Sequence, residues 1–520
     1  MVKEHNSQID CGTWVLRPAQ ECYDEGKKPI DMKWVFDTKV DATTGRMKFW
    51  KARIVARGDQ QSWQDFLETY AGVCRHSTLR LLLAIAALLG LVLTAADVST
   101  AYLHAPLRGV TVWMKQPEGF AETIGGEPAL CKLKMALYGL RQSAREWAIT
   151  LREWLIEYGF KRCTSDPYMF ILHTSAGILI LLLWVDDIFL GHTDAVMRAT
   201  FMAAFCIRFR VTDLGPMTQA LGASVTQDVA GGTVSFGLER YIQGVARRFG
   251  LSAVNDAFAD IPLPVKLAKE CTEAVVPDIE VVEVIDIYRV MTGIVVFVAT
   301  FARPDVAFAA HFLSSFGRRP GHVHLRLARR VLSYLVSTAH MHITYRRSAG
   351  SMQANFKPLL DGTGPDEAGA PHMPVDTDHG ISRSITGWLF ILAGAGVSWG
   401  VRSQQQPSLS STEAEMYGIS TAVADLVTCV NVACEMGFTM EGPVEVFSDS
   451  RGARLLVSDV ASAARCRHIH RRWFFVRFFV DEGLVVIAPV KGCNNPANSL
   501  TKPVGGGPFA RDRSYQLGLR

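Results

Sequence analysis

The chain has 520 residues, of which 49% are hydrophobic and 20% are charged, so it has apolar material for several buried cores and no signature of disorder. Its 54 Lys and Arg residues against 50 Asp and Glu residues give a net charge of +4, which excludes a histone-like or polybasic-tail protein. Any nucleic-acid partner must then bind to local basic patches. The 11 Cys residues include no CxxC pair, which disfavours a disulfide framework or a zinc finger and favours a reducing compartment.

The N-terminal residues are polar and mixed in charge, so no secretory signal peptide is expected. The longest apolar run, residues 81–96, is shorter than the roughly 20 residues of a membrane-spanning helix, and Gly90 interrupts it. It predicts a buried helix over 81–89 and a buried strand over 91–98. We therefore expect an intracellular protein, in a cytoplasmic particle or the nucleus, that is neither secreted nor membrane-bound.

Three zones follow one another along the chain. The first, residues 13 to about 225, alternates helical patterns such as 147–158 with β-rich runs at 33–39, 48–57, 110–115 and 178–185. The second, about 231–345, is mainly helical. Residues 349–374 are rich in Gly, Pro, Ser and Asp, which indicates a linker, and a compact α/β pattern occupies 375–502.

Two adjacent carboxylates lie between two apolar runs of the first zone. Asp186 and Asp187 follow the run 177–184 and precede the run 188–190, which predicts a buried hairpin with both acids at its turn. Adjacent aspartates at such a turn repel one another and are costly to desolvate unless a cation neutralises them. An ordinary exposed Asp-Asp turn is the alternative.

A third carboxylate, Asp97, also ends a buried apolar run, 91–96. Two buried strands that each end in a carboxylate predict one shared site. Two divalent ions held by such aspartates suit in-line phosphoryl transfer.

These acids belong to stretches that resemble the reverse transcriptase of copia-type (Pseudoviridae) LTR retrotransposons, in the family's order and spacing. The stretches are Trp34-Val-Phe-Asp-Thr-Lys39, Lys51-Ala-Arg-Ile-Val-Ala-Arg-Gly58, Asp97-Val-Ser-Thr-Ala-Tyr-Leu-His104, Met114-Lys-Gln-Pro-Glu-Gly-Phe120, Leu137-Tyr-Gly-Leu-Arg-Gln142 and Trp184-Val-Asp-Asp187. The family's hairpin usually has Tyr where this chain has Trp184.

The resemblance implies an α+β fold, a right-hand polymerase with fingers, palm and thumb, followed by an α/β ribonuclease H-like domain. Fingers and palm would occupy 13–225, thumb and connection 226–348, a linker 349–374 and the ribonuclease H-like domain 375–505. The implied activity is RNA-directed DNA synthesis with two Mg²⁺ ions (or Mn²⁺) per active site. Its partners would be an RNA template, a DNA primer, the RNA–DNA hybrid and dNTPs. The family's capsid, protease and integrase parts do not occur in this sequence, so we expect a fragment, a processed product or a slice of a gene model.

By the same resemblance, Asp97 and Asp186 would be metal ligands, with Asp187 beside them as the weaker one. Tyr102 matches the aromatic residue under the incoming sugar, where a ring would clash with a 2′-hydroxyl and select deoxynucleotides. The alternative for Tyr102 is a plain core aromatic.

Three further residues match nucleotide-binding positions of the family. Lys51 and Arg53 match the fingers strand whose cations reach the incoming triphosphate, and Arg suits bidentate phosphate contact. Gln142 matches a residue near the nucleotide and the template, and the alternative for it is a surface residue.

The middle zone resembles the family's thumb and connection region, for example at Ala302-Arg-Pro-Asp305. Arg326, Arg329 and Arg330 fall at i, i+3 and i+4, on one helical face that would hold the phosphates of a primer–template duplex. A solvated basic face is the alternative. His322 and His324 alternate as on a strand or loop, and with no acid or Cys at ligand spacing they predict no metal site.

A second set of acids opens the C-terminal zone. Asp376 lies on its first strand, Glu413 at the start of its first helix and Asp449 at the end of a later strand, which would make a second two-metal site suited to phosphodiester hydrolysis. Each acid alone also reads as a cap or turn residue. Together they resemble the ribonuclease H domain that follows copia-type reverse transcriptase, with Glu415 as the alternative helix ligand.

The sequence departs from that family at the fourth expected ligand. Asn498 stands where the family has Asp, so one neutral oxygen replaces a charged one. His470 and Phe474 stand where Asp and His are more usual. The arginines of this stretch could instead contact nucleic-acid phosphates: Arg465, Arg467, Arg471, Arg472 and Arg477. We therefore expect ribonuclease H activity to be weak or absent. A catalytically silent relic that only binds nucleic acid is the alternative for the whole chain.

Overall fold

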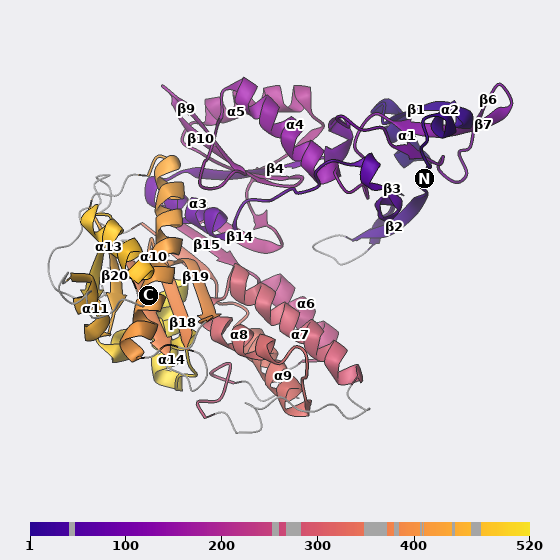
Figure 1. The fold of residues 1–520 in the computed structure, drawn as a ribbon. Coiled ribbons are helices and arrows are strands. Elements are labelled where there is room, and N and C mark those ends of the chain that lie inside the picture. Colours follow the sequence, from indigo (N-terminus) through magenta and orange to yellow (C-terminus); the bar gives the residue numbers. More distant parts are fainter. Residues whose placement is uncertain are drawn as a thin grey trace. The chain divides into compact units, whose positions relative to one another are not determined.

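A computed structural model describes residues 1–40, 47–251, 259–266, 282–347, 372–378, 384–405, 408, 410–438, 442–458 and 470–519 (Figure 1). Most of the predicted linker 349–374 lies outside these residues. Contacts divide the chain into two compact units. The first comprises Met1–Cys74 and Thr94–Gly215, and the second comprises Arg75–Leu93 and Pro216–Arg520. The four ranges predicted from the sequence, for fingers and palm, thumb and connection, linker and ribonuclease H-like domain, remain a prediction.

The first unit is built mainly from strands, with four α-helices among its described residues. The helices are α1 (Val2–Asp10), α2 (Ala19–Asp24), α4 (Ser143–Tyr158) and α5 (Ala195–Arg208). The strands are β1 (Trp14–Pro18), β2 (Met32–Val40), β3 (Met47–Ala56), β4 (Val92–Val98), β5 (Trp113–Met114), β6 (Thr123–Ile124), β7 (Glu127–Leu133), β8 (Lys161–Arg162), β9 (Met169–Thr174), β10 (Gly177–Trp184), β11 (Asp187–His192) and β12 (Val211–Pro216). Short 3-10 turns are η1 (Gly58–Gln60), η2 (Trp63–Asp65) and η3 (Ala101–His104).

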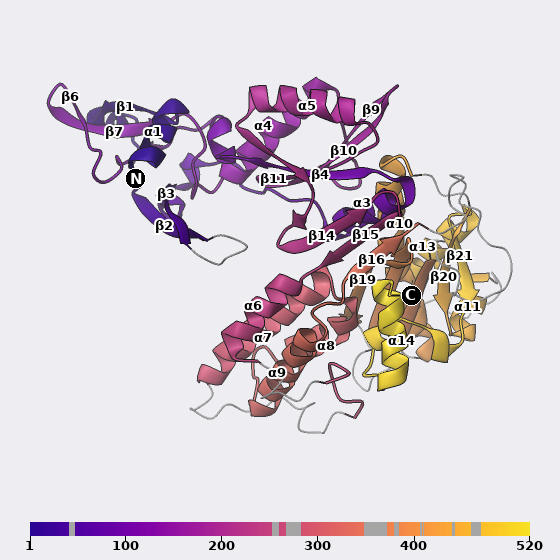
Figure 2. The same cartoon turned by 180° about the vertical axis from the view of Figure 1, so that it is seen from behind.

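A six-stranded sheet in the order β12-β4-β11-β10-β9-β8 forms the centre of this unit. Strand β10 reads Gly-Ile-Leu-Ile-Leu-Leu-Leu-Trp, and its continuous apolar run fits a strand that is buried on both faces. Helices α4 and α5 lie along the sheet (Figures 1 and 2). They pack on it through large apolar side chains such as Trp147, Leu151 and Phe205. The antiparallel pair β2-β3 and the sheet β1-β7-β5 complete the unit. The predicted strand over 110–115 is reduced to two residues, Trp113–Met114.

The second unit combines a helical part with a five-stranded sheet. Its helices are α3 (His76–Leu89), α6 (Glu239–Phe249), α7 (Val282–Phe301), α8 (Ala307–Ser315), α9 (His322–Ser337), α10 (Ser411–Glu435), α11 (Arg451–Ser458), α13 (His470–Asp481) and α14 (Gly506–Leu517). Its strands are β13 (Gln219–Ala220), β14 (Ala223–Asp228), β15 (Thr233–Gly237), β16 (Ile343–Arg346), β17 (His372–Asp378), β18 (Ile385–Leu392), β19 (Ala395–Ser403), β20 (Val444–Ser448) and β21 (Val485–Pro489). The 3-10 turns are η6 (Pro304–Val306), η8 (Gly492–Asn494) and η9 (Asn498–Leu500). The large sheet has the order β19-β18-β17-β20-β21, and β13-β14-β15-β16 form a smaller one.

The helix α3 is apolar all round because the second unit surrounds it, and every residue from Thr78 to Leu88 is buried. Its single buried cation, Arg80, donates hydrogen bonds to the carbonyls of Val397, Thr300 and Phe301 at 2.7–3.0 Å. Thr300 and Phe301 are the last two residues of α7, and the C-terminal end of a helix carries a partial negative charge. The carbonyl oxygens at this end therefore stabilise the buried guanidinium of Arg80.

Among the residues of the second unit that the structure describes, two helices are long and apolar enough to cross a membrane by length and composition alone: the α7 window 284–301 and α10. Half of each window is buried within the chain. Helix α7 packs against α8 and α9, and helix α10 packs against β17, β18 and α13. Core helices of globular proteins share these properties, so the pattern is weak evidence for a membrane span.

One expectation from the sequence is wrong. His322 and His324 do not alternate along a strand or loop, because α9 begins at His322. His324 is fully buried, stacks on Phe316 and accepts a hydrogen bond from the backbone N–H of Gly321 through its Nδ1 atom at 2.9 Å. The side chain caps the helix, a role that the alternation of two His residues cannot reveal.

The carboxyl group of Asp512 on α14 makes stability depend on pH. Burial raises the pKa of Asp512 to about 6, although Arg511 donates a hydrogen bond to its Oδ1 atom at 3.0 Å. The Oδ2 atom and the Oε1 atom of Gln516, one helical turn away, have no hydrogen-bond partner among the described residues. Because the folded-state pKa exceeds the unfolded value, the native state binds more protons, and stability falls as pH rises from about 4 through 6.

We expect Asp512→Asn to stabilise the second unit by about 2 kcal/mol at pH 7.5, since it removes a buried charge and adds an N–H group that can donate to Gln516. At pH 3, below the unfolded-state pKa of about 4, the carboxyl is protonated in both the folded and the unfolded state, and the difference should nearly vanish. Urea unfolding of both proteins at the two pH values measures this. An equal stabilisation at both pH values would contradict the assignment.

Candidate polymerase active site

The turn between β10 and β11 carries the two adjacent aspartates. The strands pair in antiparallel register up to Trp184 and Asp187, so Val185 and Asp186 form a two-residue turn. Val185 has φ +59°, a left-handed conformation that a β-branched residue rarely adopts, so the turn is strained. The indole of buried Trp147 on α4 donates a hydrogen bond to the Val185 carbonyl at 2.6 Å and holds the turn in place.

The third aspartate lies on the neighbouring strand. Asp97 is in β4, which is adjacent to β11 in the sheet. The backbone N–H of Val98 donates to the carbonyl of Asp186 at 2.9 Å. The structure therefore brings Asp97 beside the turn that bears Asp186 and Asp187, although almost 90 residues separate them along the chain.

The charges of these three carboxyl groups act on one another. Burial raises the pKa of Asp187 to about 6, and the negative charges of Asp186 and Asp97 add to the increase. An all-carboxylate set of this kind suits a hard cation such as Mg²⁺. Among the described residues, no three His, Cys, Asp or Glu side chains are grouped as a ready-made metal site. Mg²⁺ in nucleotide-transferring sites is usually held by one or two carboxylates together with substrate phosphates and water, which is compatible with this arrangement.

Two tyrosine rings lie next to the acidic turn. Tyr102, in η3, packs on Tyr138 with ring centroids 4.8 Å apart. Burial and the charge of Asp186 raise the pKa values of both hydroxyl groups. Tyr138 lies in the stretch Leu137-Tyr-Gly-Leu-Arg-Gln142, but its contact with Tyr102 joins segments distant in sequence, so the motif alone gave it no role.

The predicted nucleotide-binding cations lie on the β2-β3 hairpin. Lys51 and Arg53 are two residues apart on β3 and so share one face, which also carries Asp37, 3.8 Å from the Arg53 guanidinium. The end of β3 is joined to the tyrosine pair because the Ala56 N–H donates to the Tyr138 carbonyl at 2.8 Å. The residue after Tyr138 is Gly139, with φ +91°; a Cβ atom there would lie 2.2 Å from the Ala56 carbonyl oxygen, so only glycine fits.

Gln142 is buried, which excludes the surface alternative. Its side-chain amide donates to the Asp65 carbonyl at 3.0 Å and accepts from the Gln61 amide at 3.1 Å. These bonds connect the loop before α3 to the start of α4. Both the nitrogen and the oxygen of the Gln142 amide are therefore hydrogen-bonded within the protein.

The second set of predicted acids lies in the second unit. Asp376 is on β17, opposite Gly387, and its side chain lies outside the described residues. Glu413 is buried in the first turn of α10, which the Ser410 hydroxyl caps by accepting from the Glu413 N–H. Asp449 directly follows β20, and the alternative ligand Glu415 is also buried in α10.

Close contacts join the segments that carry these acids. A Cβ atom on Gly452, three residues after Asp449, would lie 2.7 Å from the hydroxyl of Thr412, the neighbour of Glu413. The side chain of Asn495 donates to the carbonyl of Val375, the neighbour of Asp376, at 2.8 Å. Strand β17 also pairs in parallel with β20, with Pro374 opposite Phe447, so the fold brings the three segments to one end of the sheet.

Asn498 uses its amide for a structural contact. Its Nδ2 atom donates to the Gly492 carbonyl at 2.5 Å, and a Cβ atom on Gly492 would lie 2.9 Å from the Asp449 Oδ2 atom. The amide thus holds η8 beside Asp449, and a carboxylate at position 498 could not donate this bond.

The arginines predicted to contact nucleic acid have different surroundings. On α9, Arg326 is exposed and Arg329 half-buried, while Arg330 donates a long hydrogen bond of 3.4 Å to the Ile261 carbonyl. On α13, Arg472 binds Ser420 and lies over the Tyr417 ring, while Arg477 binds the Val457 carbonyl. Other predicted phosphate contacts, at positions 465 and 467, lie outside the described residues.

Comparison with known proteins identifies the class. Residues 21–263 match the family described as "Reverse transcriptase (RNA-dependent DNA polymerase)". The chain therefore contains a reverse transcriptase domain. This match and the mixed helix-and-strand architecture confirm the predicted α+β, polymerase-type fold.

The relatives define the family more narrowly. Over 483 residues the chain is 30% identical to "Retrovirus-related Pol polyprotein from transposon TNT 1-94" of Nicotiana tabacum, covering 92% of this chain and 35% of that protein. It is 27% identical to "Retrovirus-related Pol polyprotein from transposon RE1" of Arabidopsis thaliana, and the match covers 97% of this chain and 32% of that protein. The chain is similar to copia-type Pol polyproteins over most of its own length, as its motifs predicted, and it spans about a third of the length of these relatives.

A solved structure with some likeness is described as "Structure of the foamy viral protease-reverse transcriptase dRH in complex with ds DNA". It is 11% identical, with a TM-score of 0.43, and the match covers 90% of this chain and 68% of that one.

Proposed function

We propose that the first unit adds deoxynucleotides to the 3′ end of a DNA primer on an RNA template, by a two-metal mechanism. The observation that carries the proposal is the position of Asp97 beside the turn bearing Asp186 and Asp187. When bound there, two Mg²⁺ ions would lower the pKa of the primer 3′-hydroxyl and stabilise the leaving pyrophosphate. Mn²⁺ is the alternative cation.

The neighbouring residues have separate roles in this proposal. Asp97 and Asp186 hold the cations, and Asp187 assists from the β11 side of the turn. Lys51 and Arg53 bind the triphosphate of the incoming dNTP. Gln142 acts by fixing the loop that approaches the nucleotide and the template, because its amide is already bonded within the protein.

Primer extension on an RNA template with Mg²⁺ tests the polymerase proposal. The chain should extend a DNA primer with dNTPs, and extension should require the divalent cation. If the chain binds primer–template without extending it, the catalytically silent alternative is correct.

Tyr102 is proposed to exclude ribonucleotides, because its ring is held by Tyr138 next to Asp186. Tyr102→Ala should raise incorporation of ribonucleotides relative to deoxynucleotides by about tenfold or more, since a steric block is removed from the pocket. Single-nucleotide incorporation with matched dNTP and rNTP pairs measures the ratio. Tyr102→Phe is the control, since it keeps the ring and should keep the selectivity; equal ratios in all three proteins would refute the role.

The C-terminal part, from β17 to α14, is proposed to be a ribonuclease H-like domain that contacts the RNA–DNA hybrid with weak or no cleavage. Asp376, Glu413 and Asp449 are the proposed metal ligands. The arginines Arg326, Arg329 and Arg330 of α9 are proposed to hold duplex phosphates. Asn498 supports the proposal of weakened cleavage. Its side chain is neutral, and its amide nitrogen donates a hydrogen bond to the Gly492 carbonyl.

We expect Asn498→Asp to increase cleavage of an RNA–DNA hybrid over the unmodified chain, because it adds a negative oxygen for the cation. The same change should lower stability by about 1–3 kcal/mol, since the donor to the Gly492 carbonyl is lost. Cleavage of a labelled hybrid measures the gain, with Asn494→Asp, at an exposed neighbour, as the control. No gain in the folded variant would count against the metal-ligand position.

A further inference from the structure

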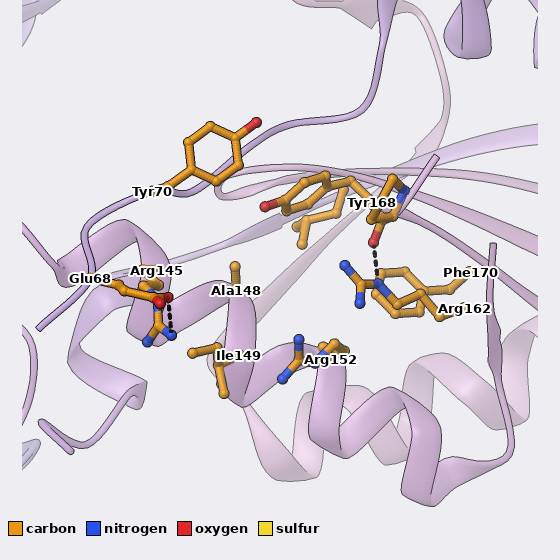
Figure 3. Close-up of a pocket in the computed structure, with 11 residues that line it drawn as sticks. Glu68, Tyr70, Arg145, Ala148, Ile149, Arg152, Arg162, Tyr168 and Phe170 are labelled. Atoms are coloured by element: carbon orange, nitrogen blue, oxygen red, sulfur yellow. Dashed lines mark hydrogen bonds and ion pairs between the residues drawn. The ribbon is translucent and has the colours of Figure 1, made fainter. Parts of the chain in front are cut away.

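A small pocket in the first unit lies at the β8-β9-β10 side of the central sheet. Its volume is about 220 Å³, and it lies between α4 and the segments around Tyr70 and Tyr168 (Figure 3). Pockets for drug-sized ligands usually measure about 300–1,000 Å³, so this one accepts a smaller group. None of the residue roles proposed above uses this pocket.

The lining of the pocket is cationic, with Arg145, Arg152 and Arg162 against a single acid, Glu68. Arg145 neutralises Glu68 in an ion pair of 2.8 Å. Arg162 donates from Nε to the Pro167 carbonyl at 2.9 Å. The side chain of Arg152 makes no hydrogen bond or ion pair within the described part of the chain, so the Arg152 guanidinium and the outer nitrogens of Arg162 can bind a phosphate.

The other wall is aromatic. Tyr70 is 82% exposed, and Figure 3 shows its ring and that of Tyr168 across the hollow from Ala148 and Ile149. The Tyr168 hydroxyl accepts from the Gly72 N–H at 2.6 Å, and a Cβ atom on Gly72 would lie 2.5 Å from the Tyr168 ring. The ring is therefore fixed. A planar base can stack in such a slot, and base–aromatic stacking tolerates any base.

Both walls are attached to the turn that bears the catalytic acids. The Leu183 N–H donates to the Tyr168 carbonyl at 2.9 Å, three residues before Asp186. On the other wall, Trp147 precedes Ala148 and donates to the Val185 carbonyl. The pocket is thus adjacent to the acidic turn, on the side away from β4 and Asp97.

We propose that this pocket takes one unpaired nucleotide of the template strand, with its base against the tyrosines and its phosphate on Arg152 and Arg162. The proposal rests on the polymerase function proposed above. A pocket of this size has no room for a base pair, and the unpaired template nucleotides in a copying complex are those not yet copied. The pocket would therefore hold a nucleotide ahead of the copied position.

Binding without Mg²⁺ or dNTPs tests the pocket separately from catalysis. The probes are a hairpin DNA primer with an RNA template strand, either blunt-ended or with a six-nucleotide 5′ template overhang. The unmodified chain should bind the overhang probe about tenfold more tightly than the blunt one, which is the scale of one stacked base. An overhang that gives no advantage would overturn the proposal, even if primer extension succeeds.

The double change Arg152→Ala and Arg162→Ala should abolish this overhang advantage and leave blunt-end affinity within about twofold, since only the pocket cations are lost. Tyr70→Ala, at a highly exposed side chain, should weaken overhang binding without affecting folding. Arg17→Ala removes an exposed cation of the same unit and is the matched control. An advantage that survives in the double variant, with thermal unfolding unchanged, would refute the assignment. If the advantage is lost as expected but no protein extends primers, the pocket stands and the polymerase proposal fails.

Discussion

Asp186→Asn is expected to lower nucleotide addition by about a thousandfold or more, because a metal-assisted step loses several kcal/mol of charge stabilisation with one ligand. The substitution keeps the shape of the side chain. It also removes one of three mutually repelling charges, so the Asp187 carboxyl, whose pKa is about 6, should ionise more easily and the metal-free fold should not weaken. Single-turnover primer extension on an RNA template at saturating Mg²⁺ measures the rate.

Asp10→Asn, at an exposed acid of the same unit, is the control and should retain the full rate. Equal extension by the unmodified chain and Asp186→Asn would show that the carboxylate at the turn takes no part in the reaction.

The largest expected effect on stability comes from the buried ion pair between Arg303 and Asp305 in the second unit. Two guanidinium nitrogens donate to the two carboxylate oxygens at 2.8 and 2.7 Å, and the Tyr334 hydroxyl donates to the same carboxylate at 2.6 Å. Burial would raise the pKa of Asp305, but the charge of Arg303 and these hydrogen bonds lower it. Arg303 also donates twice to Thr338 at the end of α9, so one side chain fastens η6 to that helix.

Arg303→Ala should destabilise the second unit by about 3–5 kcal/mol, because it leaves a buried carboxylate without its counter-charge. Adding Asp305→Leu to an Arg303→Met background should restore most of the loss, since an apolar pair of similar volume removes both charges. Urea unfolding measures each change. Arg57→Ala, which breaks the exposed pair with Asp59, is the control and should cost less than about 1 kcal/mol. A similar small cost at both sites would contradict the buried-pair account.

Much of the first unit could be predicted from local sequence pattern. The apolar run 177–184, the two acids and the apolar run that follows specify the hairpin, and the run before Asp97 specifies β4. The local pattern does not show that β4 lies beside this hairpin in the sheet. That expectation came from the order of the motifs in the copia-type family. The positions of the site residues are now described, while their roles remain predictions.

Other features could not be predicted, because they depend on contacts between distant segments. The bond from Trp147 to the strained Val185 and the packing of Tyr102 on Tyr138 join parts of the chain that share no motif. The run 81–96 predicted a buried helix and a buried strand. A helix that is apolar on all sides can be buried in any hydrophobic core, so the sequence does not show in which unit it packs. In the structure α3 packs in the second unit.

The claim that one cation site is shared by β4 and the β10-β11 turn can be tested by Fe²⁺-directed cleavage. Fe²⁺ replaces Mg²⁺ in the complex with primer–template, and ascorbate and peroxide then generate hydroxyl radicals at the bound ion. The account predicts backbone cleavage both near Asp97 and near residues 185–187, and Asp97→Asn should weaken both cuts together. Cleavage at only one of these places, or two cuts that respond independently to the substitution, would contradict it.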